Sequence, residues 1–241
     1  MKATLIGPLF AAALLFAVGC GTSEYEKRLE AHIEQMKKGS AFDAMQPAVT
    51  LAVAEDSVQV RMLPGMERLG EADGNRASPP GYDMKGRAAT YEGFVTDSED
   101  GKIAYYCYLG GEKLNPQMAE HFEYYIKSKF EKSFPNADPQ WQEVNATTAT
   151  GAAVEWKKIR VDAKQDYYYV DSDGAGRFEP LDGFFEMWVR KEAGVLLKMA
   201  WRVPDSIVPN VEIDKWAPRV AGSMRIGGEA AAAPAGGADD P

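Results

Sequence analysis

The sequence predicts an α+β domain in which helices pack against an antiparallel β-sheet. Predicted strands and helices come in groups along the chain, and do not alternate one by one as they do in a parallel α/β protein. Several predicted strands are joined by short turns, as antiparallel strands are, and one predicted helix has a strong apolar stripe. The chain has 241 residues, of which 45% are hydrophobic and 26% charged, and this composition fits a single globular domain.

The first predicted strands lie before residue 110. Residues Val58–Met62 alternate apolar and polar side chains, as a half-buried strand does, and Pro64-Gly65 end this strand. The stretch Pro64–Arg87 contains five glycines and three prolines, which predicts a long loop. The runs Thr90–Val95 and Ile103–Leu109 flank a turn-rich segment, so they predict a β-hairpin.

An amphipathic helix is predicted after this hairpin. Asn115 is a favourable N-cap, and Pro116 at the first helical position loses no hydrogen bond. Apolar residues then recur at helical spacing as far as Phe134-Pro135, where the helix should end. The stripe consists of Met118, Phe122, Tyr125, Ile126 and Phe130. A stripe of this width predicts that the helix packs on the sheet.

The second half of the chain predicts further strands and a closing helix. The strands are expected at Ala152–Val161, Asp166–Val170, Phe184–Lys191 and Val195–Val203. A tight Glu192-Ala193-Gly194 turn joins the last two. The closing helix should begin near Asp214 or Lys215, because Pro218 is tolerated only in a first turn. Its apolar side carries Trp216, Val220 and Met224.

Part of this pattern resembles a known fold group. The helix through Met118 and Phe130, long strands that carry Trp156, Trp188 and Trp201, and the closing Ser223-Met224-Arg225-Ile226 are similar to the PsbP-like fold group. The resemblance implies a sheet sandwiched by helices. It implies no function, because one fold hosts many functions.

The first residues predict export and lipid attachment. Lys2 gives a positive start, and the apolar run Leu5–Val18 is shorter than the roughly 20 residues that span a bilayer. The segment Ala17-Val18-Gly19-Cys20 resembles a bacterial lipobox, which implies that Cys20 is acylated, with palmitate as one such chain, and becomes the first mature residue. Gly21 follows and, by resemblance to the sorting rule of bacteria with two membranes, favours the outer membrane. An ordinary secretory signal or a short uncleaved anchor are the alternatives.

The chain therefore divides into four expected parts. Residues 1–19 are the signal peptide. Residues 20–41 are the lipidated N-terminus with a spacer helix over Ser23–Lys38, whose apolar stripe is too thin for a core helix. Residues 42–226 form the α+β domain, and residues 227–241, rich in Ala, Gly and Pro, form a disordered tail. The membrane, reached through the lipid, is the one partner that this organisation implies.

Charge and the scarce reactive residues exclude several function classes. With 27 Lys+Arg against 36 Asp+Glu, a net charge of −9, the chain lacks the basic excess that nucleic-acid binding needs. Acylation of Cys20 leaves Cys107 without a disulfide partner, inside an apolar run typical of an inert core cysteine. The histidines, His32 and His121, form no metal-binding or catalytic motif, so no catalytic residue is assigned.

One acidic loop partly resembles a calcium-binding loop. Between Asp171 and Asp182, carboxylates occupy several of the positions that ligate calcium in such loops. The candidate ligands are Asp171, Asp173, Glu179 and Asp182. Ala175 and Pro180 depart from the pattern, and an acidic turn between two strands explains the same residues without a metal.

Tyrosines form a second candidate feature. They cluster on the predicted strands, and neighbours such as Tyr105 and Tyr106, or Tyr167 and Tyr168, must point to opposite faces of a sheet. One set could line a ligand or glycan surface. Packing within the core and sheet is the favoured explanation, because tyrosine is a common strand residue whose polar end needs only water.

These observations favour a non-enzymatic binding or accessory module of the bacterial cell envelope. Two alternatives stay open: a carboxylate-dependent hydrolase of envelope polymers, and a domain stabilised by calcium. The sequence identifies neither the ligand nor the envelope protein or polymer that the module would contact.

Overall fold

The computed structural model describes residues 42–70, 82–98 and 101–227, together with Lys27, Leu29, Glu30, Ile33 and Ala77. Cys20, the signal peptide, most of the predicted spacer helix and the predicted tail beyond Gly227 lie outside the described residues. Leu29 and Ile33, on the apolar stripe of the spacer helix, are in helical conformation and exposed. No helix within the described ranges is long and apolar enough to cross a membrane.

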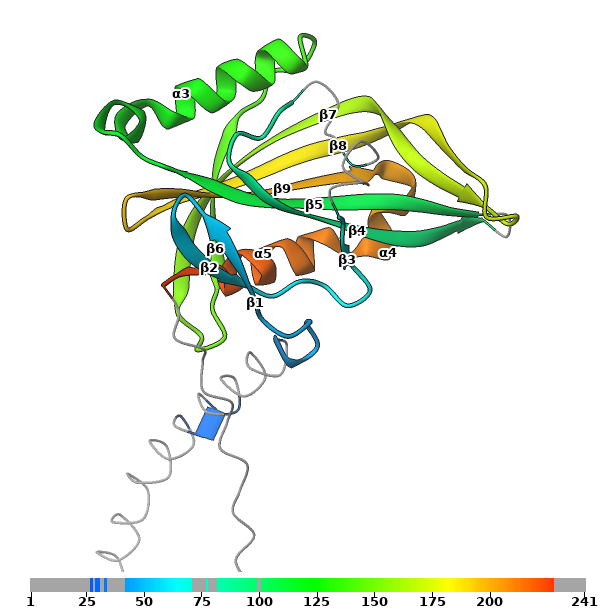
Figure 1. The fold of residues 1–241 in the computed structure, drawn as a ribbon. Helices are drawn as coiled ribbons and strands as arrows, with labels where there is room; N and C mark the ends of the chain where they lie inside the picture. Colours follow the sequence, from blue (N-terminus) through cyan, green and yellow to red (C-terminus); the bar gives the residue numbers. More distant parts are fainter. Residues whose placement is uncertain are drawn as a thin grey trace, which may run out of the picture.

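A seven-stranded antiparallel sheet forms the centre of the domain (Figure 1). Its strand order is β3-β4-β5-β9-β8-β7-β6. These strands are β3 (Glu67–Arg68), β4 (Arg87–Ser98), β5 (Gly101–Lys113), β6 (Trp141–Thr147), β7 (Ala153–Asp171), β8 (Gly176–Glu192) and β9 (Val195–Pro204). A smaller sheet, in the order β1-β2-β10, consists of β1 (Val49–Val53), β2 (Asp56–Val60) and β10 (Arg225–Ile226).

The two faces of the large sheet are covered by different elements. Helix α3 (Pro116–Ser133) crosses one face, while α4 (Val208–Val211), α5 (Ile213–Ser223) and the small sheet lie on the other (Figure 1). Each face has its own hydrophobic cluster. The predicted α+β class, an antiparallel sheet packed by helices, is confirmed.

Strand β5 contributes side chains to both hydrophobic clusters. Tyr105, Cys107 and Leu109 belong to the cluster on the α5 side, and Tyr106 and Tyr108 belong to the cluster on the α3 side. This is the alternation that a strand imposes on successive side chains. All five side chains are buried. The interpretation of these tyrosines as packing residues is therefore confirmed.

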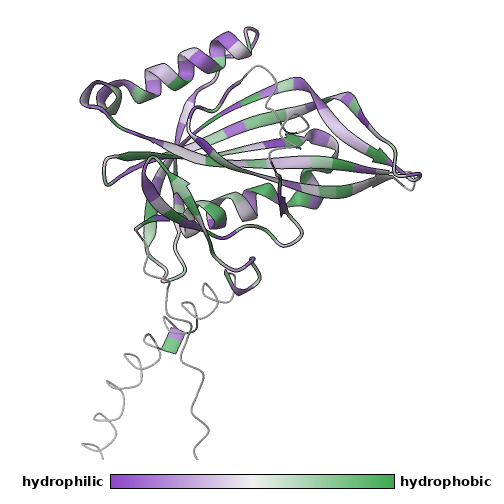
Figure 2. Ribbon diagram, in the orientation of Figure 1, coloured by the Kyte–Doolittle hydropathy of each residue, from purple (hydrophilic) through white to green (hydrophobic). Residues whose placement is uncertain are grey.

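Helix α3 forms as its sequence predicts. The Asn115 side chain accepts a hydrogen bond from the Met118 backbone N–H at 2.8 Å, which caps the first turn. Phe122, Ile126 and Phe130 are the buried residues of the helix. Figure 2 shows hydrophilic and hydrophobic residues alternating along α3, as expected for a helix with one face on the sheet.

The β8–β9 hairpin also matches its prediction. Its turn consists of Ala193 and Gly194, both with positive φ, at 47° and 80°. Two such residues in succession are typical of the tight turn that suits the twist of antiparallel strands.

Three expectations about strands and helices were wrong in detail. The two strands expected over Ala152–Val161 and Asp166–Val170 are one strand, β7, because the polar residues between them contain no Gly or Pro and pair with β8. Strand β8 begins at Gly176, eight residues before the expected start. Helix α5 begins at Ile213, so Pro218 lies in its second turn, where proline removes one helical hydrogen bond.

Strands β1, β6 and β10 and the short helix α4 were not predicted. Strand β6 lies at a sheet edge, and Ala146 is the one residue in it that is fully buried, so it lacks a strong apolar pattern. Strand β10 has two residues and is formed by pairing with β2 across most of the chain. The predicted loop over Pro64–Arg87 is described only in part, and its described residues include the short strand β3.

Glycines and tyrosines fit together at four places in the large sheet. At Gly93, Gly101, Gly176 and Gly183, an added Cβ atom would overlap the ring or hydroxyl of a tyrosine on the neighbouring strand. Those tyrosines are Tyr105, Tyr169, Tyr168 and Tyr167, respectively. Each ring thus occupies the space that a side chain would fill. The tyrosine-rich strands and the glycines opposite them form a single packing arrangement.

We expect Gly183→Ala to destabilise the domain by about 1–3 kcal/mol, the usual cost of overpacking. The new Cβ would collide with the Tyr167 hydroxyl and lie 2.6 Å from the Val203 carbonyl oxygen. Urea unfolding monitored by tryptophan fluorescence measures the loss. Gly70→Ala is the matched control, because no atom lies within 4 Å of its added Cβ. Equal stability of the two variants would contradict this packing role.

Candidate functional site

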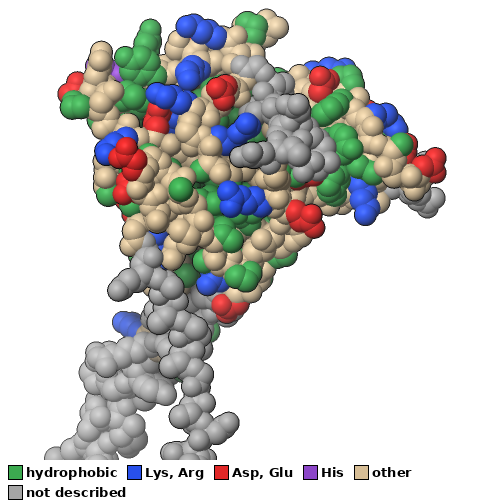
Figure 3. All heavy atoms as spheres, in the orientation of Figure 1, with side chains coloured by type: hydrophobic (Ala, Val, Ile, Leu, Met, Phe, Trp, Pro, Cys, Tyr) green, Lys and Arg blue, Asp and Glu red, His purple; other side chains and the backbone are tan. Residues whose placement is uncertain are grey.

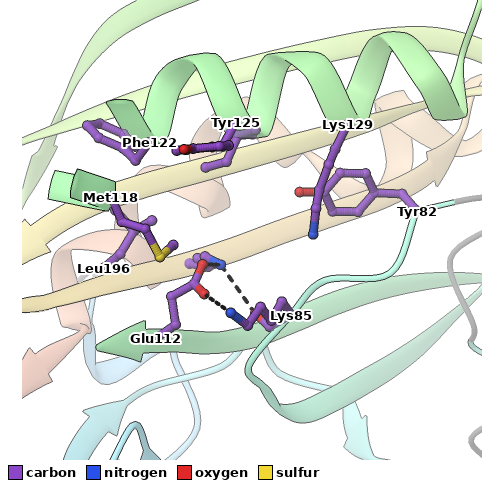
Figure 4. A pocket seen from close by; sticks show the side chains of 10 residues that line it. Tyr82, Lys85, Glu112, Met118, Phe122, Tyr125, Lys129 and Leu196 are labelled. Atoms are coloured by element: carbon purple, nitrogen blue, oxygen red, sulfur yellow. Dashed lines mark hydrogen bonds and ion pairs between the residues drawn. The ribbon is translucent and has the colours of Figure 1, made fainter. Parts of the chain in front are cut away.

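A cavity of about 220 Å³ lies between α3 and the large sheet (Figure 4). We call it the α3 groove. Its apolar and aromatic lining consists of Tyr82, Met118, Phe122, Tyr125, Ile126 and Leu196. Its charged lining consists of Lys85, Glu112, Lys129 and Lys198. The groove therefore offers an apolar surface and charged groups to the same ligand.

Helical spacing and strand alternation bring these residues together. Met118, Phe122, Ile126 and Lys129 follow one another at intervals of three or four residues, so they share the face of α3 that looks onto the sheet. Tyr125, three residues after Phe122 and four before Lys129, lies at the side of this face. Strands β5 and β9 supply Glu112, Leu196 and Lys198 from the opposite wall, and Glu112 is paired directly with Leu196.

Glycines allow another segment that lines the groove to approach the sheet closely. The segment from Tyr82 to Gly86 lies against β5, where the Gly111 N–H donates to the Gly86 carbonyl oxygen at 2.9 Å. An added Cβ on Gly86 or Gly110 would collide with backbone in this contact. The close approach places Tyr82 and Lys85 at the groove. The glycines and prolines of this segment predict a loop, and no local pattern in it indicates a role at a site.

A buried ion pair lies in the wall of the α3 groove. The Lys198 side chain is 5% exposed, and its ammonium group forms an ion pair with Glu112 and donates to the Lys85 carbonyl oxygen at 3.2 Å. The Lys85 ammonium lies 3.3 Å from the same Glu112 carboxylate. Lys129 has no carboxylate partner among the described residues. Figure 4 shows Lys129 reaching down from α3 toward this cluster.

The pKa values of the pair are shifted by burial and by each other. Burial raises the pKa of Glu112, but the hydrogen bonds and charges of Lys198 and Lys85 outweigh it and hold that pKa below its ordinary value. Burial lowers the pKa of Lys198, and Glu112 offsets this only in part. The Glu112 carboxylate is therefore ionised at neutral pH, and it fixes the position of two of the three lysines.

The candidate calcium ligands do not converge on one point. Asp171 and Glu179 both contact the Arg177 guanidinium, at 3.4 and 2.7 Å. Asp182 lies in β8 opposite Lys164, and the Asp171 side chain caps the turn by accepting from the backbone of Asp173 and Ala175. No group of three or more His, Cys, Asp or Glu side chains in the described ranges is arranged to hold a metal. The calcium site stays a prediction, and Arg177 explains the contacts observed here.

Within the described part of the chain, the buried and half-buried carboxylates Glu92, Glu112 and Glu186 do not form a facing pair either. Glu92 and Glu112 lie on the α3 face, but Glu92 is paired with Tyr106, which is about 20 Å along β5 from Glu112. Glu186 shares the opposite face with Trp188 and binds its indole N–H at 2.6 Å and Lys158 at 3.2 Å. This arrangement gives the hydrolase alternative no support.

A buried arginine accompanies the tyrosines on the α3 face. Arg202 lies beside Tyr106 in the sheet, with its guanidinium 5.4 Å from the Tyr106 ring and 4.8 Å from the Tyr167 ring. Burial raises the pKa of Tyr108 to about 12 although Arg202 acts against it. Burial also raises the pKa of the Cys107 thiol, in agreement with its interpretation as an inert core residue. Sequence analysis did not single out Arg202, because nothing in the local pattern shows that it is buried.

A second cavity, of about 600 Å³, lies where β7 and β8 diverge beyond the Lys157–Val189 pair. Its lining holds acidic and basic side chains in equal number, and Lys157 lies 2.7 Å from Glu123. On the face shown in Figure 3, acidic and basic side chains are interspersed, and hydrophobic ones form small separate patches. Of these two cavities, the α3 groove is the one whose lining carries an uncompensated charge.

Comparison with known proteins finds similarity to solved structures. The chain is similar to the solution structure of the cyanobacterial PsbP protein (CyanoP) from Synechocystis sp. PCC 6803, with a TM-score of 0.32 and 10% sequence identity over 70% of this chain and 86% of that chain. No protein-family model matches the chain, and no curated protein matches it. The similar structure belongs to the fold group that the sequence resembles, and it indicates nothing about a ligand.

We expect Glu112→Gln to destabilise the domain by about 3 kcal/mol at pH 7, because it leaves the Lys198 ammonium buried without its partner. The double variant Glu112→Leu with Lys198→Met should recover most of this loss, since it removes both charges. The folded pKa of Glu112 lies below the ordinary value of 4.5, so its contribution is present above that pH and is lost as the pH falls through the folded pKa.

Urea unfolding of the three proteins between pH 7 and pH 3 tests this. Two results would show that the ion pair does not stabilise the domain in this way. One is a double variant as unstable as Glu112→Gln at pH 7. The other is a difference in free energy of unfolding between the unaltered chain and Glu112→Gln that does not shrink below pH 4.5.

Proposed function

We propose that this chain is a membrane-tethered binding module of the bacterial cell envelope that holds a small ligand in the α3 groove. The observation that carries the proposal is the groove itself. A domain needs no cavity of mixed apolar and charged lining for stability, since interiors are normally close-packed, whereas ligand sites are concave, mostly apolar and equipped with a few polar groups.

Binding fits the chemistry of the groove better than catalysis does. The charged groups that line it are three lysines and one carboxylate, and the carboxylate is already engaged with Lys198 and Lys85. A general base needs a free acceptor within reach of its proton, and this carboxylate is occupied. These lysines can attract and position a ligand without any bond being broken.

The position of the groove supports a tethered arrangement. Phe42, the first residue of the folded domain, packs in the hydrophobic cluster on the α5 face, and the α3 groove lies on the opposite face. Because residues 20–41 precede Phe42 in the chain, the predicted attachment through Cys20 would join the domain at the face away from the groove. Tethering in this way leaves the groove open to the surrounding compartment.

We expect Cys20→Ala to release the protein from the membrane. The unaltered chain should incorporate labelled palmitate. It should also sediment with membranes, because several acyl chains on one cysteine anchor a protein stably. In a host with two membranes, we expect the outer one. Labelling and membrane fractionation measure both properties. Cys107→Ala is the control and should change neither. Palmitate labelling that survives in Cys20→Ala would refute lipidation at this residue.

We expect Met118→Trp to block the α3 groove. Met118 is partly exposed on the groove face of α3, so a larger side chain there fills the cavity without entering the core. Binding of the neutral fluorescent probe N-phenyl-1-naphthylamine to the chain from Gly21 to Pro241, which keeps every described residue, should weaken about tenfold or more, a change of roughly 1.4 kcal/mol.

Gln117→Trp is the matched control, because Gln117 is exposed on the same turn of α3 and does not line the groove. It should leave binding of the probe unchanged. No saturable binding by the unaltered chain, or equal binding by both variants, would mean that the groove is not a ligand site.

A further inference from the structure

We infer that the ligand of the α3 groove is a single-chain amphiphile with an anionic head group, such as a carboxylate. This inference rests on the proposed function and adds the chemical class of the ligand. Size, charge and the arrangement of the lining each point to it.

The size of the groove limits the ligand to one chain. Pockets for drug-sized ligands usually measure about 300–1,000 Å³, and the α3 groove measures about 220 Å³. A lipid with two acyl chains does not fit this volume, but one short chain does.

Charge in the groove selects an anion. Three lysines face one carboxylate, so two positive charges remain uncompensated, although the chain as a whole carries a net charge of −9. Asp83 is close enough to raise the pKa of Tyr82, but it does not line the groove. A local positive site on an acidic protein attracts anions specifically, because the field in a partly buried cavity is screened less than at the surface.

The three lysines contribute to this positive charge in different ways. Lys198 is buried and held by Glu112 and the Lys85 carbonyl oxygen, so it fixes a charge in the wall. The Lys85 side chain is 68% exposed, and Lys129 is exposed on α3 without a carboxylate partner among the described residues. The ammonium groups of Lys85 and Lys129 are therefore the ones that an incoming head group can reach.

Met118 and Lys129 lie toward opposite ends of the groove. Figure 4 shows Met118, Phe122 and Leu196 gathered near the start of α3, with Lys129 farther along the helix, beside Tyr82. Met118 and Lys129 are 11 residues apart, or about 16 Å along the helix axis. A molecule that lies along the groove thus meets a cluster of apolar side chains at one end and the Lys129 ammonium group at the other, which suits a medium-length acyl chain with a carboxylate.

A free amphiphile fits better than a bilayer lipid as the source of this head group. The groove holds one chain, and the predicted tether enters on the opposite face of the sheet. Decanoate represents the free form, and vesicles that contain phosphatidylglycerol represent an anionic head group within a bilayer.

Displacement of N-phenyl-1-naphthylamine from the chain from Gly21 to Pro241 tests the inference. We expect decanoate to displace the probe at a concentration at least about tenfold lower than decyltrimethylammonium, which has the same chain and the opposite charge. The double variant Lys85→Gln with Lys129→Gln should lose about tenfold in decanoate affinity and keep its affinity for the neutral probe.

The matched control is Lys127→Gln with Lys132→Gln, which changes the net charge equally with lysines of α3 that do not line the groove. It should bind decanoate like the unaltered chain. Equal displacement by decanoate and decyltrimethylammonium, or an equal loss of decanoate affinity in both double variants, overturns the anionic class of the ligand. The proposed function stands in that case if the neutral probe still binds. Binding to the vesicles with no displacement by decanoate overturns the free amphiphile.

Discussion

The structure depends on a sheet whose central strands are buried on both faces. Every residue of β9 is buried, and so are nine consecutive residues of β5. Antiparallel sheets commonly leave one face in water, but this one needs a cover on each side. Helix α3 supplies one cover, and α5 with the small sheet supplies the other. Polar residues in the centre, such as Lys198 and Arg202, must then find partners inside the domain, since water does not reach them.

The α3 groove follows from that constraint. Helix α3 packs through Phe122, Ile126 and Phe130 and does not cover the full width of the sheet. The segment from Tyr82 to Gly86 closes the face from the other side, held against β5 by glycines. Between these two covers the sheet presents the ion pair of Lys198 and Glu112, which would be costly to bury beneath an apolar side chain. The charge and the cavity therefore have one structural origin.

Local sequence signals predicted local structure well. The cap of α3, its apolar stripe, the turn between β8 and β9 and the alternation of neighbouring tyrosines all depend on residues close together in the chain. The groove depends on contacts that no local pattern contains. Lys85, Glu112 and Lys198 meet only because the register of β5 and β9 sets Gly110 opposite Lys198. Until that register is known, the sequence does not show that Lys85 in a loop and Lys198 in a strand belong to one site.

Strand β5 pairs with β9 across a long stretch of chain, and this has a consequence for how the protein folds. Tyr106 is paired with Arg202, so the central ladder of the sheet joins residues almost a hundred positions apart. Strands β7, β8 and β9 form a meander from consecutive hairpins and can assemble by themselves. The β4–β5 hairpin precedes them in the chain, and the free edge of β5 stays unpaired until β9 has formed. An unpaired edge between apolar faces is prone to aggregation, so the interval before β9 pairs is the most vulnerable stage of folding.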